Sequence, residues 1–136
     1  MSSEIFWLTL SAVNTALLVY IYAPPRVRRI GLKRVFTDPL PGDDPFPEGQ
    51  EWAHRAYRAH MNAVENLVVF APLAIAVYVT GASNEVTTAA CATYFWARLL
   101  HGPLYVVNTP YVRFPLYMIA LAACLVLAWE LLAWSA

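Results

Sequence analysis

The chain has 136 residues, which is enough for one domain. It is 60% hydrophobic and only 13% charged, whereas charged residues make up about a quarter of typical soluble domains. A soluble domain of this size cannot bury so much apolar surface, so the composition excludes an ordinary soluble protein and indicates a membrane protein. The formal net charge is +0 at pH 7, so no overall charge attracts nucleic acid.

An uncharged apolar segment covers residues 5–23. As a helix it spans about 28 Å, close to the thickness of a bilayer core. A signal peptide would have basic residues before a shorter apolar core, whereas here the basic residues follow the segment. We therefore predict a retained transmembrane helix over residues 4–23, which Pro24 and Pro25 end.

The following stretch, residues 24–49, is predicted to be a loop. Five of the nine residues from 26 to 34 are basic, which is typical of the flank of a membrane helix. Residues 37–50 are rich in proline, acid and glycine and are interpreted as an exposed segment. Asp43 and Asp44 lack a third ligand, so no metal site is predicted.

A second helix is predicted over residues 50–80, with a polar first half and an apolar second half. At about 45 Å it is longer than the membrane core. Arg58, Asn62 and Glu65 are spaced i, i+4 and i+7, which places them on one face. Charge at the depth where a helix enters lipid indicates a functional site. The alternative is a solvated helix end in which charged side chains pair with one another.

A third helix is predicted over residues 85–106, with Asn84 as its N-cap. An arginine inside an apolar span is hard to explain by packing alone, so we interpret its face as functional. Four polar residues of this helix fall at i, i+4, i+7 and i+11 and share that face: Tyr94, Arg98, His101 and Tyr105.

A fourth helix is predicted over residues 114–134, and Arg113 and Tyr117 at its start are spaced i, i+4. The two cysteines, Cys91 and Cys124, lie in apolar runs, without a CxxC motif or a zinc-type Cys and His cluster. We interpret both as small buried hydrophobic residues.

The basic residues are sorted along the chain. All nine Lys and Arg lie near the side where the first and third helices end and the second and fourth begin. By the positive-inside rule this side, including the loop 24–49, faces the cytoplasm, and both termini face away from it. Four helices with short connections form an up-down-up-down bundle. We therefore predict an all-α, multi-pass integral membrane protein of one domain, residues 1–136, in a bacterial inner membrane.

The polar parts of the second, third and fourth helices are predicted to meet at the cytoplasmic end. Three arginines, Arg58, Arg98 and Arg113, are then near a single glutamate, Glu65. Glu65 can pair with only one of them, and Arg98 is the best placed, so the other guanidinium groups favour an anionic ligand such as a carboxylate. The sequence contains no Ser-His-acid set and no phosphate-binding glycine loop, so we expect the ligand to carry its own reactive group.

The segment 55–66, RAYRAHMNAVEN, resembles the signature of the MAPEG family, the membrane-associated proteins in eicosanoid and glutathione metabolism. In that family the second helix carries an arginine-alanine-histidine, an asparagine and a glutamate at this spacing. ARLLHGPLY, in the third helix, resembles the family's arginine followed by a His or Tyr and a further Tyr. The resemblance covers nearly the whole chain, in helix count, basic first loop and motif positions.

The resemblance implies a homotrimer of four-helix subunits, with glutathione bound as a co-substrate between neighbouring subunits at the cytoplasmic end. Arg113 would stabilise the glutathione thiolate, and Tyr105 would be the second catalytic residue. Met61 departs from the basic residue that some eicosanoid-converting members have at this position. The residues expected to bind glutathione, carried over by position, are Arg58, Asn62, Glu65, Arg98, His101, Tyr117 and Arg26.

The implied function is a glutathione-dependent membrane transferase or peroxidase that acts on lipophilic electrophiles. Its expected partners are glutathione, a lipophilic small molecule, membrane lipids and two further copies of the chain, with no nucleic acid. The alternative is a non-catalytic MAPEG-like protein that serves as an accessory or assembly subunit and uses the polar face for helix contacts. A transporter is disfavoured, because four short helices lack the paired broken segments expected there.

Overall fold

The computed structural model describes residues 2–37 and 49–135. The predicted loop residues 38–48, with Asp43 and Asp44, lie outside the described residues. Within the described part the chain is all-helical, as predicted, and forms four long helices if α1 and α2 are taken together. The helices are α1 (Ser3–Leu17), α2 (Val19–Ile30), α3 (Leu32–Thr37), α4 (Glu51–Thr80), α5 (Glu85–Val106) and α6 (Pro110–Trp134).

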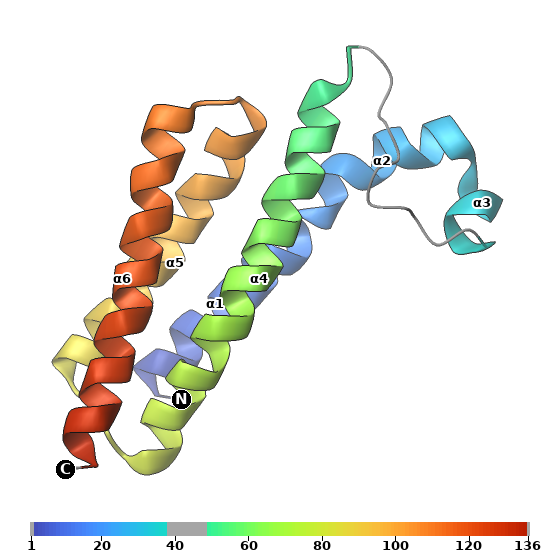
Figure 1. Cartoon of the computed structure of the whole chain (residues 1–136). Helices are drawn as coiled ribbons and strands as arrows, with labels where there is room; N and C mark the ends of the chain where they lie inside the picture. The colour runs from blue at the N-terminus through green and yellow to red at the C-terminus, as the bar shows by residue number, and fades with distance from the viewer. Residues whose placement is uncertain (1, 38–48, 136) are drawn as a thin grey trace.

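The four long helices alternate in direction. Both termini and the α4–α5 turn lie at one end of the bundle, while the start of α4 and the α5–α6 connection lie at the other (Figure 1). α5 packs against α1, α4 and α6. Within the described residues, three segments are long and apolar enough to cross a membrane: Ser3–Ile30, Glu51–Thr80 and Pro110–Trp134. α5 is not among them, and it buries Thr87, Arg98 and His101.

The prediction that Pro24 and Pro25 end the first helix is wrong. After a break at Leu18 the helix continues as α2 to Ile30, with both prolines inside it. A proline in a helix interior costs about 3 kcal/mol, because it removes a backbone hydrogen bond. Packing against α4 offsets this cost: buried Tyr22, two residues before Pro24, contacts the ring of Tyr57 on α4. Residues 24–30 and 32–37 of the predicted loop are therefore helical.

The helix ends mostly follow local capping chemistry. Asn84 caps α5 as predicted, and Asn84 and Thr87 form a reciprocal capping box. Gly81 ends α4 in the left-handed conformation, with φ 74°, which glycine adopts without strain. α6 begins at Pro110 rather than at residue 114, because proline is favoured in the first turn of a helix.

Small and aromatic residues hold the bundle together. Phe70 of α4 stacks on Tyr94 of α5, with 3.7 Å between the ring centroids. Cys91 and Cys124 are buried free thiols in the same core. At the end that carries the termini, the buried carboxylate of Glu4 accepts hydrogen bonds from the hydroxyls of Thr87 and Thr88 and ties α1 to α5.

The orientation of the bundle in the membrane can be tested by labelling. We expect the end that carries the basic residues to face the cytoplasm, as the positive-inside rule requires. In intact cells a membrane-impermeant maleimide should label Ser83→Cys, and should label Ile30→Cys only after permeabilisation. Labelling of Ile30→Cys but not Ser83→Cys from outside would reverse the orientation. Cys91 and Cys124 are buried and do not compete for the reagent.

Candidate functional site

A polar pocket of about 370 Å³ is lined by the first half of α4 and the end of α5. Its volume falls within the range of about 300–1,000 Å³ that is usual for small-molecule sites. Six of the lining residues come from α4 and one from α5: His54, Tyr57, Arg58, Met61, Asn62, Glu65 and Tyr105. The structure thus brings four of the predicted site residues into one wall, namely Arg58, Asn62, Glu65 and Tyr105.

Helical periodicity on α4 explains this wall. The outward stripe carries large polar or flexible side chains at i, i+4, i+7 and i+11: His54, Arg58, Met61 and Glu65. The opposite face carries four buried alanines, which let the neighbouring helices approach closely: Ala53, Ala56, Ala59 and Ala63. The same helix therefore packs through its small residues and presents charge to the pocket.

Arg98 lies behind the pocket wall and is only 4% exposed. Its Nη2 donates to Asn62 Oδ1 at 3.0 Å, while Nε and Nη1 are buried and have no hydrogen-bond partner among the residues that the structure describes. The predicted pairing of Arg98 with Glu65 is not formed, since among the described residues no carboxylate lies within ion-pair distance of Arg98. Glu65 is instead exposed and lines the pocket. With Oδ1 held by Arg98, the Asn62 amide nitrogen remains as a donor.

Tyr105 connects the pocket to α6. The Arg113 guanidinium lies over the Tyr105 ring, 4.2 Å from its centroid, in a cation–π contact. The ring of buried His101 lies 5.6 Å from the Tyr105 ring, and its Nδ1 has no hydrogen-bond partner among the described residues. Tyr117 is half-buried and close enough to Arg98 for an electrostatic interaction. Arg113, His101 and Tyr117 thus lie beside or behind the residues of the wall.

Arg26 is not brought to the pocket within a single chain. It lies on α2, close enough to Tyr22 for an electrostatic interaction, and its Nε is buried without a partner among the described residues. Tyr22 in turn hydrogen bonds through its hydroxyl to His60 Nδ1 at 2.9 Å, which fixes α2 against α4.

Sequence reasoning missed three residues of the pocket wall: His54, Tyr57 and Met61. His54 and Met61 could have been found, because they continue the spacing of Arg58 and Glu65 on α4. Arg55 of the same motif has a structural contact instead, since its Nε donates to the Val106 carbonyl oxygen at 2.8 Å. It thereby ties the start of α4 to the end of α5.

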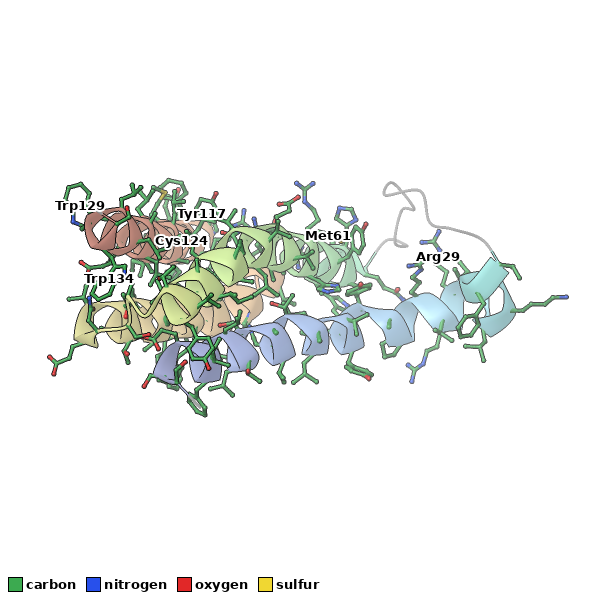
Figure 2. The ribbon with its side chains drawn as sticks, turned by 90° about the horizontal axis from the view of Figure 1, so that it is seen from below. Arg29, Met61, Tyr117, Cys124, Trp129 and Trp134 are labelled. Carbon is green, nitrogen blue, oxygen red and sulfur yellow. The ribbon has the colours of Figure 1, made fainter. Side chains whose placement is uncertain are left out.

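Side chains along the bundle mark its two ends. Exposed Trp129 and Trp134 lie at the end opposite Arg29, with Tyr117 and Met61 between them (Figure 2). Tryptophan favours the membrane–water interface, so these residues are suited to anchor the end that carries the termini.

Together the fold and the site define a helical membrane protein with an arginine-containing polar pocket at one end. The family model of the MAPEG family matches residues 5–133, nearly the whole length, and the chain belongs to the MAPEG family. This is a family of membrane proteins associated with glutathione-dependent transfer and eicosanoid metabolism. Comparison with curated proteins and with solved structures gave no match.

Proposed function

We propose that this protein is a glutathione-dependent membrane transferase or peroxidase that acts on lipophilic electrophiles. The observation that carries the proposal is the polar pocket at one end of an otherwise apolar bundle, with Arg58 in its wall and the incompletely partnered Arg98 behind it. Burying unpaired hydrogen-bond donors and cations close to the lipid costs free energy. An anionic ligand that paired with these groups would offset the cost.

The pocket chemistry matches the groups of glutathione. This tripeptide carries two carboxylates, one ammonium group and a thiol. The planar guanidinium of Arg58 suits a carboxylate, to which it can donate two parallel hydrogen bonds. The exposed carboxylate of Glu65 suits the ammonium group, and the Asn62 amide nitrogen, left free by the bond to Arg98, can donate to a carbonyl or carboxylate.

The reactive species would be the glutathione thiolate. Free thiols titrate near 8.5, and only the thiolate attacks. A positive guanidinium close to the sulfur favours the charged form. The contact of Arg113 with Tyr105, a residue of the pocket wall, supports this role for Arg113. The thiol proton leaves to water, and the sulfur then forms a bond to an electrophilic carbon that arrives from the lipid. In a substitution, the bond from this carbon to its leaving group breaks and the group departs as an anion such as halide. In an addition, the π bond of an activated double bond breaks and the resulting carbanion takes a proton from water. With a hydroperoxide, the thiolate takes the terminal oxygen and releases an alcohol, and a second glutathione forms the disulfide and water.

The site is incomplete in one chain, which supports a trimeric assembly. Arg26 does not line the pocket of its own chain. In a homotrimer with glutathione between neighbouring subunits, as the family resemblance implies, a second copy would supply this missing cation. Symmetric homo-oligomers repeat the same interface, so each interface would hold one glutathione.

Native mass spectrometry in detergent tests binding and assembly together. During a titration with glutathione we expect trimers that take up one ligand per interface and then saturate. S-methylglutathione, which keeps the carboxylates and the ammonium group, is expected to compete, while a neutral thiol of similar size is not. Only monomers would refute the trimer, and trimers without saturable adducts would refute the glutathione site.

The alternative is a non-catalytic accessory subunit. Two contacts favour it, because Arg98 and Arg55 already use their side chains to join helices. If the titration shows no saturable glutathione binding, the polar face serves only to join helices. The protein is then an accessory subunit and not an enzyme.

A further inference from the structure

The segment α2–α3 departs from the bundle. α2 leans away from the other helices, and α3 projects to one side of them (Figure 1). Among the described elements α2 packs only on α1, α3 and α4, and α3 contacts only α2. α2 continues directly from α1, and together they form the segment Ser3–Ile30, which is long and apolar enough to cross a membrane. The basic arm, defined as residues 26–37, begins in the last residues of this segment and continues beyond it.

The basic arm exposes large apolar side chains. Leu32 is 60% exposed and Phe36 is 81% exposed. Both are on α3 at i and i+4, so they are on the same side of this short helix. An exposed leucine alone needs no explanation, but two large apolar groups on one face beside a membrane helix suit insertion into the lipid interface.

The charge of the basic arm has one sign. It contains five basic residues, and no acidic residue occurs between residues 5 and 37. Arg28 and Arg29 are in the last turn of α2 and are exposed, and Lys33 follows as an exposed residue in α3. Such a cluster next to a membrane helix is complementary to the phosphates of anionic lipids.

We propose that the basic arm is a lipid-binding element that lies on the membrane surface. Leu32 and Phe36 insert into the headgroup region, and Arg28 and Lys33 bind the phosphates of anionic lipids. Three features of the arm support this assignment: its apolar face, its single sign of charge and its continuity with a membrane helix. The assignment does not depend on glutathione binding, because Leu32, Phe36, Arg28 and Lys33 line no part of the polar pocket and, unlike Arg26, are not among the residues proposed to bind glutathione.

The arm can be tested on the full chain with a fluorescent probe. Thr37→Cys, labelled with an environment-sensitive dye, keeps both apolar anchors and all basic residues. In nanodiscs of phosphatidylcholine mixed with phosphatidylglycerol, we expect blue-shifted emission and protection from aqueous iodide. Both effects should weaken in phosphatidylcholine alone and at high salt. Adding Arg28→Gln or Lys33→Gln should lower membrane association of the arm about fivefold for each removed charge.

Two controls make the result decisive. Arg28→Lys keeps the charge and should restore protection, and the same dye at Val107→Cys, on the exposed α5–α6 connection at the same end, should show no dependence on anionic lipid. Leu32→Ser with Phe36→Ser should abolish protection of the probe. A probe that is equally accessible in both lipids overturns the proposal. Equal protection in both lipids and in detergent also overturns it, because protein would then cover the arm.

Discussion

Replacement of Arg113 by leucine is expected to raise the pKa of the thiol of bound glutathione and to slow conjugation at neutral pH. In the proposed role the positive guanidinium would stabilise the thiolate, so its removal should move the thiol back toward its ordinary pKa near 8.5. A rise of one pKa unit corresponds to about 1.4 kcal/mol. At a pH below the thiol pKa of both the variant and the unchanged protein, such a rise lowers the fraction of thiolate about tenfold. At a pH above both thiol pKa values, Arg113→Leu and the unchanged protein should react at similar rates. Thiolate ultraviolet absorbance followed against pH measures the shift directly.

Two variants separate charge from packing at this position. Arg113→Lys keeps a positive group and should retain most of the lowered pKa, although its contact with the Tyr105 ring changes. Tyr105→Phe keeps the ring on which Arg113 lies and removes only the hydroxyl. If Arg113→Leu leaves both the thiol titration and the rate unchanged, Arg113 is only a flanking charge of α6, and its role in catalysis is abandoned.

Replacement of Arg58 by leucine is expected to act on binding rather than on thiol chemistry. Arg58 is exposed in the pocket wall, so its loss removes charge-assisted hydrogen bonds to a ligand carboxylate without opening the core. Such bonds contribute about 1.5–3 kcal/mol each, which corresponds to roughly 10- to 100-fold weaker glutathione binding. Isothermal titration with glutathione measures this effect. The pKa of the bound thiol should stay as in the unchanged protein once glutathione saturates the site.

Arg28→Leu is the matched control for Arg58→Leu in detergent. It also removes one exposed arginine, but on α2 and outside the pocket wall. Its glutathione affinity should therefore match that of the unchanged protein. Equal losses in both variants would show that general charge, and not Arg58, attracts glutathione.

The positions of the long helices and the pocket wall on α4 could be predicted from the sequence. Apolar length sets where a chain crosses a membrane, and the 3.6-residue period places Arg58, Asn62 and Glu65 on one face whatever surrounds them. Local chemistry also suffices at Asn84, whose side chain caps the helix that follows it. These features depend on residues close together in the chain.

Features that depend on contacts between distant residues could not be predicted. The helix continues through Pro24 and Pro25 because Tyr22 packs against α4, and no local rule contains that contact. Arg98 binds Asn62 rather than Glu65, although both possible acceptors are on α4. The rotation of α4 relative to α5 decides which of these two side chains lies within reach of Arg98, and that rotation depends on contacts between distant residues. In the proposed trimer, the position of Arg26 relative to a neighbouring copy would likewise be a property of the assembly and not of one chain.

The burial of Cys91 and Cys124 has a consequence for the chemistry proposed for the pocket. A protein that gathers electrophiles and oxidants from lipid exposes its own nucleophiles to them, and a solvent-accessible thiolate is the first to react. Both thiols are enclosed in the core between α5 and α6, away from the polar pocket. They are therefore protected from alkylation and from mixed disulfides with glutathione. Turnover would consume only the thiol that the ligand brings, and the protein would not inactivate itself through its own cysteines.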